Sequence, residues 1–271
     1  MSSTASIGEQ PGFYDDPLIY DVLHTQGTAE DVKGLIRIAT EHGLKKGLKG
    51  GWFEPFCGTA RHLRAVALHG ARVTGLDLSG PMIEFAQGVF DRRGLKGSLL
   101  TGDASCAHEL AGSESHAFAF CLINSMRHLM HGKAALAHMR SVHRLLKPGG
   151  VYAVGVNYGG FEDGVALEHA SEDVWKGGRG RLSVTQVVQY EPPVEPSSRV
   201  ETVRSVLDIR RGDAEPETRV SVYTLRTYTG AQWMDLVSRS GFEHTGSVDE
   251  DGEPHDPGRA GYAIHLLCKP R

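Results

Sequence analysis

The sequence has no long hydrophobic run: no stretch reaches the ~18 apolar residues that a membrane-spanning helix needs. Its N-terminal stretch MSSTASIGEQPG is polar and lacks the apolar core of a secretory signal. Basic residues are not in excess, since 29 Lys and Arg face 33 Asp and Glu. Because nucleic-acid binders normally present a basic face, the net charge of -4 argues against nucleic acid as an obligate partner. These absences predict a cytoplasmic protein that engages neither membrane nor nucleic acid.

Cysteine is scarce and scattered. The four cysteines form no C-x-x-C pair: Cys57, Cys106, Cys121 and Cys268. Reduced thiols in a cytosolic protein are the simplest interpretation. Fourteen histidines are present, and His128 and His131 form an H-x-x-H. No cluster of Cys, Asp or Glu completes a metal site around them, so we expect no metal cofactor.

The first part of the chain does have a regular alternation of strands and helices. Short apolar runs predict strands at 51–54, 72–78, 98–101, 116–124 and 151–156. Helical periodicity lies between them, and its clearest stripe is Met82, Phe85, Ala86, Val89 and Phe90. Strands alternating with helices at this spacing predict a parallel sheet with right-handed crossovers, in an α/β fold.

The pattern changes after residue 157. Three runs between 181 and 228 alternate apolar and polar residues: RLSVTQVVQY, SRVETVRSVLDIR and TRVSVYTLRTY. This alternation is typical of antiparallel strands, so we predict an inserted sheet or lid. A helix at 230–240 and a strand at 262–269 then return to the core. We divide the chain into an N-terminal segment (1–27), an α/β core (28–157), a β-rich insertion (158–229) and a C-terminal part completing the core sheet (230–271).

The loop after the first strand lacks the glycines of a phosphate-binding turn. Ligands of open α/β sheets bind at the carboxyl ends of the strands, where GWFEPFCGTAR (51–61) lies. A dinucleotide pyrophosphate favours G-x-G-x-x-G, whereas here Gly58 is flanked by Phe56 and Arg61. S-adenosylmethionine has no phosphate, and Glu54 with nearby backbone groups can bind its amino acid end. The loop therefore favours S-adenosylmethionine over a dinucleotide.

Two further acids end the next strands. Asp77 ends the second and can accept both ribose hydroxyls; alternatively it is a charge favoured at a helix N-terminus. Asp103 closes the third in TGDAS and can reach an adenine amino group, while Ala104 lends its amide. The alternative for Asp103 is a carboxylate that caps its own loop.

These motifs resemble those of class I S-adenosylmethionine-dependent methyltransferases. EPFCGTARHL resembles the first motif, VTGLDLSGPMIEFA the second, TGDAS the third, and LLKPGGVY the turn into the fifth strand. Phe56 and Ala60 stand where the family usually has its first and third glycines. The resemblance implies a Rossmann-like seven-stranded, mostly parallel sheet with helices on both faces and an antiparallel β insertion. It also implies that the last strand, in GRAGYAIHLLCK, runs antiparallel.

The resemblance also implies the cofactor contacts. S-adenosyl-L-methionine is expected against Tyr14, Tyr20, Glu54, Phe56, Gly58, Arg61, Asp77, Leu78, Met82, Asp103, Ala104 and Asn124. The stretch N-S-x-x-H-L (124–129) resembles a loop of small-molecule N-methyltransferases, including the glycine and aminosugar branch. For the two tyrosines, simple packing of an N-terminal helix is the alternative.

His128 is the candidate catalytic residue, as general base or as a group that positions the acceptor, because its pKa lies near neutrality. The alternative is a histidine bonded to loop backbone. Expected substrate contacts are Asn124, His128, Tyr158, Tyr223 and Arg226. Arg226 can meet a carboxylate or phosphate, or it is an exposed strand residue.

We predict methyl transfer to a small-molecule acceptor, with nitrogen favoured over oxygen or carbon. A dinucleotide-dependent oxidoreductase and a non-catalytic S-adenosylmethionine-binding protein are the rival hypotheses. The long antiparallel strands of the insertion also make a homodimer possible.

Overall fold

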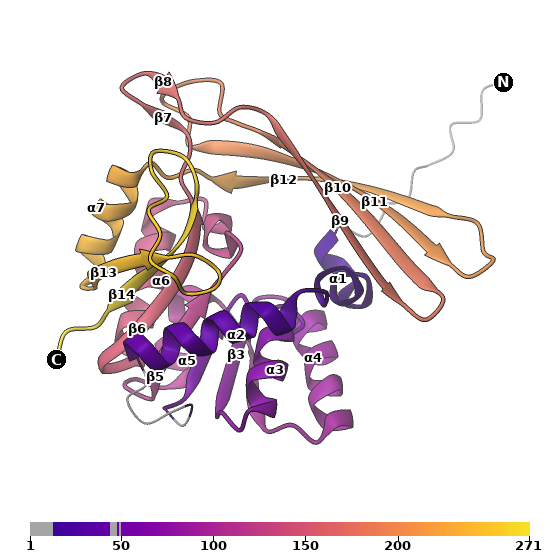
Figure 1. Cartoon of the computed structure of the whole chain (residues 1–271), viewed down its shortest axis with the longest axis horizontal. Helices are drawn as coiled ribbons and strands as arrows, with labels where there is room; N and C mark the ends of the chain where they lie inside the picture. Colours follow the sequence, from indigo (N-terminus) through magenta and orange to yellow (C-terminus); the bar gives the residue numbers. More distant parts are fainter. Residues whose placement is uncertain (1–12, 44–47, 49) are drawn as a thin grey trace.

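The computed structural model describes residues 13–43, 48 and 50–271. Within them the chain forms a seven-stranded sheet between two layers of helices, and a separate four-stranded antiparallel sheet (Figure 1). A two-stranded ribbon, β7 (Phe161–Glu162) and β8 (Val165–Ala166), links the two sheets. Short helical turns are η1 (Phe13–Asp15), η2 (Ala39–Gly43), η3 (Ala104–Cys106) and η4 (Ser125–His128).

The central sheet has the order β13-β14-β6-β5-β2-β3-β4. Its strands are β2 (Trp52–Pro55), β3 (Val73–Asp77), β4 (Gly97–Thr101), β5 (His116–Cys121), β6 (Leu146–Asn157), β13 (Glu243–Val248) and β14 (Tyr262–Cys268). The pairs from β4 to β6 are parallel, whereas β14 runs antiparallel to both β6 and β13. The predicted fold and its antiparallel last strand are confirmed. The chain order reverses between β2 and β5, which places the ligand crevice of such a sheet at their carboxyl ends.

Alternating side chains build a core on each face of this sheet. Trp52 belongs to the core under α2 (Thr28–Ile38), α3 (Arg61–Leu68) and α4 (Gly80–Arg93). Its neighbour Phe53 belongs to the opposite core, under α6 (Gly132–Leu145) and α7 (Gly230–Ser240), with α5 (Ala107–Ala111) beside them. Both faces are therefore covered, which explains the nearly continuous apolar character of β5.

The helix ends follow local sequence signals. Ser79 caps α4 by accepting a hydrogen bond from the Met82 N–H, and Gly94 ends the helix in the left-handed conformation. Thr229 and Gln232 form a reciprocal capping box at the start of α7. These caps place the first turns of α4 and α7 next to the strands that precede them.

The four-stranded sheet has the order β12-β11-β10-β9. Its strands are β9 (Ser171–Arg179), β10 (Leu182–Glu191), β11 (Val200–Arg211) and β12 (Glu217–Arg226). The sequence predicts only three of them. The segment of β9 was missed because Val174 and Trp175 are its only large apolar residues, so it shows no alternation.

Helix α1 (Pro17–His24) lies between the far end of the four-stranded sheet and the core (Figure 1). Its Ile19, Val22 and Leu23 pack against apolar residues of β10 and β11. The buried carboxylate of Asp21 accepts hydrogen bonds from Arg64 of α3 and, at 2.6 Å, from Arg179 of β9. Asp21 therefore joins the N-terminal helix to both the core and the inserted sheet. Over the described part of the chain, no helix has the length and apolar character to cross a membrane.

Candidate functional site

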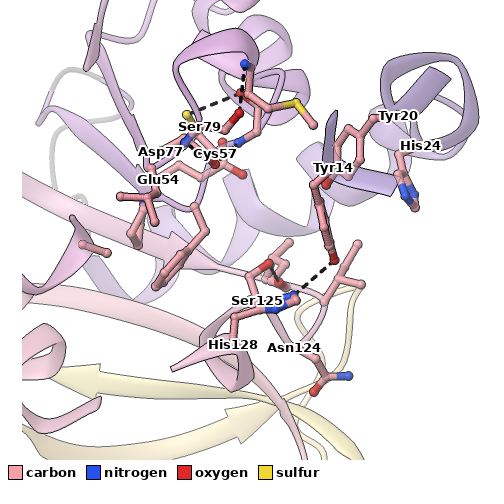
Figure 2. A pocket seen from close by; sticks show the side chains of 18 of the residues that line it. Tyr14, Tyr20, His24, Glu54, Cys57, Asp77, Ser79, Asn124, Ser125 and His128 are labelled. Carbon is pink, nitrogen blue, oxygen red and sulfur yellow. Dashed lines mark hydrogen bonds between the residues drawn. The ribbon is translucent and has the colours of Figure 1, made fainter. Parts of the chain in front are cut away.

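A cavity of about 690 Å³ opens at the carboxyl ends of β2 to β5. The N-terminal segment closes one side with Tyr14, Tyr20 and His24, which face Glu54 and Asp77 across the cavity (Figure 2). The inner face of the four-stranded sheet forms the roof through Trp175, Gln186, Val188, Tyr190, Tyr223 and Leu225. The cavity thus lies at the crevice that the strand order predicts, under a lid from a different part of the chain.

The loop after β2 has an unusual backbone. Phe56, Gly58 and Ala60 have φ of 57°, 51° and 56°, all in the left-handed region. These are the three alternating positions at which the sequence motif usually carries glycine. The loop therefore keeps a glycine-type backbone with two bulkier residues, each in a conformation that disfavours a side chain by roughly 1–2 kcal/mol. A Cβ on Gly58 would lie 3.3 Å from the Tyr20 ring, so only glycine fits there without movement.

Glu54 presents a buried carboxylate to the cavity. Its Oε1 lies 2.8 Å from Nδ1 of His62, and Nε2 of His62 lies 3.2 Å from Oδ2 of Asp31. Arg61 donates to the same Asp31 oxygen at 2.7 Å. The Glu54 Oε2 atom is buried and has no hydrogen-bond partner among the described residues. Because an unpaired buried carboxylate oxygen is unfavourable, this atom fits the ammonium of a bound amino acid.

Asp77 ends β3 and joins two loops. Its Oδ2 accepts a hydrogen bond from the Gly58 N–H at 2.7 Å, and its Oδ1 accepts one from the Ser79 N–H at 2.9 Å. Burial raises the pKa of Asp77, and the three backbone N–H groups around it oppose that shift. A carboxylate has about four acceptor positions, so two remain for the hydroxyls of a ribose.

Asp103 caps the next loop. Its Oδ1 accepts a hydrogen bond from the Ser105 N–H at 2.7 Å, which lowers the pKa of its carboxyl group. The loop-capping alternative is therefore present, and Asp103 and Ala104 also line the cavity. Burial lowers the pKa of His138 to about 4, so its neutral ring donates from Nδ1 to the Ala104 carbonyl at 3.0 Å. Nε2 then accepts from the Tyr152 hydroxyl at 2.8 Å.

His128 lies on η4, beyond the tip of β5. Its Nε2 is 3.1 Å from the Tyr14 hydroxyl, and its ring stacks on Tyr223 with centroids 5.7 Å apart. The surrounding protein and the charge of Arg127 lower the pKa of His128, although its side chain stays accessible from the cavity. A neutral imidazole is thus held against two tyrosines. Figure 2 shows its contact with the Tyr14 hydroxyl.

Asn124 closes the tip of β5. The strand ends at Cys121 rather than at Asn124, because Ile123 and Asn124 turn the chain with φ of 51° and 59°. The Asn124 Oδ1 accepts a hydrogen bond from the Asn157 N–H at 2.7 Å and so joins the ends of β5 and β6.

Most of the predicted site residues line this one cavity: Tyr14, Tyr20, Glu54, Phe56, Gly58, Arg61, Asp77, Leu78, Met82, Asp103, Ala104, Asn124, His128 and Tyr223. Tyr158 and Arg226 do not. Tyr158 stacks on His265, with centroids 5.2 Å apart, and lines a different cavity. The Arg226 guanidinium donates to the Met130 carbonyl at 2.6 Å, and it lies over the Tyr228 ring. Its charge is therefore directed away from the cavity in which we expected a substrate contact.

Sequence reasoning missed several lining residues. His62 lines the cavity and contacts Glu54; it lies in the stretch that resembles the first motif, but we assigned it no role. Asp31, which contacts His62 from α2, lies outside every motif. Gln186, Val188 and Tyr190 occupy alternate positions of one predicted strand, so its two-residue period could have indicated a shared face.

Known proteins share part of this sequence and the fold. Residues 54–150 match the family model described as "Methyltransferase domain". No curated protein matches the chain. Among solved structures, an S-adenosylmethionine-dependent methyltransferase from Clostridium acetobutylicum ATCC 824 has 16% identity and a TM-score of 0.71, covering 94% of this chain and 97% of that one. The sugar N-methyltransferase KedS8 from Streptoalloteichus sp ATCC 53650 has 18% identity and a TM-score of 0.70, covering 100% and 98%. The CcbJ methyltransferase from Streptomyces caelestis has 15% identity and a TM-score of 0.71, covering 97% and 100%.

At these identities the solved structures show the shared fold, and the family match covers the part of the chain that carries the strand-tip acids. That match places a methyltransferase domain at residues 54–150. The doubly covered sheet with its antiparallel last strand, and the fit of Glu54 and Asp77 to an amino acid and a ribose, are consistent with a class I S-adenosylmethionine-dependent methyltransferase.

Proposed function

We propose that this enzyme methylates a small molecule, with nitrogen as the favoured acceptor atom, between the tip of β5 and the four-stranded sheet. The cavity of about 690 Å³ has the size of a site for a cofactor together with a small acceptor. A neighbour with the same fold, KedS8, is described as a sugar N-methyltransferase. That description supports a small polar acceptor and a nitrogen atom as the methyl-receiving group.

The cofactor supplies an activated methyl group on a sulfonium. In our proposal Glu54 accepts hydrogen bonds from the ammonium of its methionine part, because Oε2 of Glu54 has no other partner among the described residues. Asp77 binds the ribose hydroxyls, while Asp103 and Ala104 lie at the adenine side. Aligning the acceptor with the methyl group then supplies much of the rate.

One observation supports a nitrogen acceptor above the others: the neutral imidazole of His128 lies beside the Tyr14 hydroxyl. An amine acceptor must lose its proton before or during attack. A histidine whose pKa lies below its ordinary value remains able to accept that proton at neutral pH. Tyr14 and Tyr223 hold the ring, so His128 either takes the proton or fixes the acceptor nitrogen.

The cytoplasmic location stays part of this proposal. All four cysteines of the chain are described and free, as expected in a reducing compartment.

The test begins with calorimetric titration of the protein with S-adenosylhomocysteine and, separately, with NADH. We expect binding of the first only. A panel of small amines, alcohols and activated carbon acids is then incubated with S-adenosylmethionine, and NMR of the product locates the new methyl group. His128→Asn should lower turnover of an amine acceptor far more than His131→Asn, an exposed histidine of the same segment. Binding of NADH instead, or methylation of oxygen or carbon alone, would overturn the respective part of the proposal.

A further inference from the structure

A second cavity of about 300 Å³ lies beside the cofactor cavity, at the carboxyl end of β6 and under the inner face of the four-stranded sheet. Asn124 and Tyr190 line both cavities. On β9, Trp175 lines the first cavity and Asp173 the second. The two spaces therefore share a wall, and one molecule can extend from one into the other.

The charges around the second cavity are unequal. Glu168, Asp173 and Glu201 contribute carboxylates, whereas Arg127 contributes the one guanidinium among the described lining residues and His169 an imidazole. Arg127 is only 2% exposed, and it donates to the Glu201 Oε2 at 2.7 Å and to the Arg226 carbonyl at 2.9 Å. Its charge is thus matched by Glu201, which leaves the cavity with an excess of negative charge.

Glu168 occupies a space made for its carboxylate. A Cβ on Gly159 would lie 2.1 Å from the Glu168 carboxylate atoms, so the glycine makes room for this group. The Glu168 Oε2 is buried and has no hydrogen-bond partner among the described residues. Burial and the charge of Glu201 raise the pKa of Glu168 to about 7, and Arg127 opposes that rise. A cation beside Glu168 would satisfy the unpaired oxygen and remove this electrostatic penalty.

We propose that the second cavity binds a protonated amine of the methyl acceptor, remote from the atom that is methylated, with the Glu168 carboxylate as its counter-ion. This proposal rests on the proposed function, because it places the rest of the acceptor past Asn124 and Tyr190 in the cofactor cavity. Tyr158 and Tyr190 line the same cavity, so hydroxyl groups near the amine also find partners there. The acceptor class is a small molecule that carries a positive charge remote from the methylated atom.

The test uses two probes of the same shape. Tris(hydroxymethyl)aminomethane is a cation at pH 7, and pentaerythritol replaces its ammonium by a neutral hydroxymethyl group. Each is titrated into the full-length protein with S-adenosylhomocysteine bound, at constant ionic strength, and followed by chemical-shift changes. We expect the cation to bind at least roughly ten-fold more tightly, which corresponds to one charge-assisted hydrogen bond of about 1.4 kcal/mol.

Variants locate the effect. Glu168→Gln should abolish the preference for the cation, and Glu168→Asp should retain part of it. Glu172→Gln removes an exposed carboxylate of β9 that does not line the cavity, so the preference should persist. Equal binding of the two probes, no binding of either, or a preference that survives in Glu168→Gln overturns the proposal. This binding measurement needs no turnover. A negative result here contradicts only the cation site, whereas the absence of methyl transfer in the acceptor panel contradicts the proposed function.

Discussion

Nδ1 of His62 lies 2.8 Å from Oε1 of Glu54, while the other Glu54 oxygen is buried without a hydrogen-bond partner among the described residues. Asp31 holds the second nitrogen of the same ring at 3.2 Å. Asp31 of α2 thus orients the His62 ring of α3, and His62 in turn orients Glu54 of β2. The carboxylate is positioned before any ligand binds, which lowers the ordering cost of binding.

Glu54→Gln tests this carboxylate directly. We expect the affinity for S-adenosylhomocysteine to fall by about 1.5–3 kcal/mol, because a hydrogen bond to a charged group is lost. Calorimetric titration measures it. Glu84→Gln, an exposed residue of α4, serves as the control and should bind like the wild type. Equal affinities for both variants would show that the amino acid end of the cofactor binds elsewhere.

Asp77→Ala should lower two quantities at once. The affinity for S-adenosylhomocysteine should fall by roughly 1–3 kcal/mol, since ribose hydroxyls lose their acceptor. The free energy of unfolding should fall too, because the Gly58 and Ser79 N–H groups lose theirs. Calorimetry and urea denaturation measure these effects. Asp91→Ala, on the exposed side of α4, is the control and should change neither quantity as strongly. If Asp77→Ala leaves the affinity unaltered, the ribose binds at another position.

Gly58→Ala and Gly94→Ala form a matched pair. Both glycines are left-handed, with φ of 51° and 62°, so alanine should lower the free energy of unfolding by about 1–2 kcal/mol at each. Only at Gly58 does the new Cβ meet a neighbour, the Tyr20 ring, whereas nothing lies within 4 Å at Gly94. We therefore expect only Gly58→Ala to weaken S-adenosylhomocysteine binding. Equal affinities for the two variants would show that Tyr20 does not help to form the binding site.

His128 should remain uncharged at the ordinary histidine pKa of 6.5, because the loss of solvation beside neighbouring protein groups and the charge of Arg127 lower the pKa of its ring. The His128 ring should therefore take up a proton only below pH 6.5. At pH 6.5 and above it should be neutral and able to accept a proton from the substrate. NMR titration of the ring nitrogens in ¹⁵N-labelled protein measures the pKa. Exposed His131 provides the internal comparison in the same spectra. A midpoint for His128 at or above 6.5 contradicts the prediction.

Glu168 should make stability depend on pH. Its pKa is raised from 4.5 to about 7 on folding, so between these values the folded state binds more protons than the unfolded state. Stability from this group is then fully present below pH 4.5 and lost as the pH rises to about 7. As the pH rises through this window, the free energy of unfolding of Glu168→Gln should increase by about 1–2 kcal/mol relative to that of the wild type, after allowance for partial exposure. Urea denaturation of both proteins at several pH values in this window measures the difference. If the free energy of unfolding depends on pH in the same way in both proteins, the raised pKa of Glu168 is wrong.

Local sequence patterns determined the core of this protein. The two-residue period of strands, the 3.6-residue period of helices and the turn residues between them are set by neighbours in the chain. They suffice for the parallel sheet, for helices α2, α3, α4, α6 and α7, and for the position of Glu54, Asp77 and Asp103, each at or just beyond the end of its own strand.

Tertiary structure alone decided which distant side chains meet. Tyr14 contacts His128 across 114 residues, and β9 joins the inserted sheet by pairing with β10 although its own sequence shows no strand pattern. Tyr158 and Arg226 were expected to contact the substrate in the first cavity. Tyr158 instead lines the second cavity, and Arg226 donates to the Met130 carbonyl. The direction in which a side chain points, and the partner it meets, follow from the packing of whole layers, which no short stretch of sequence encodes.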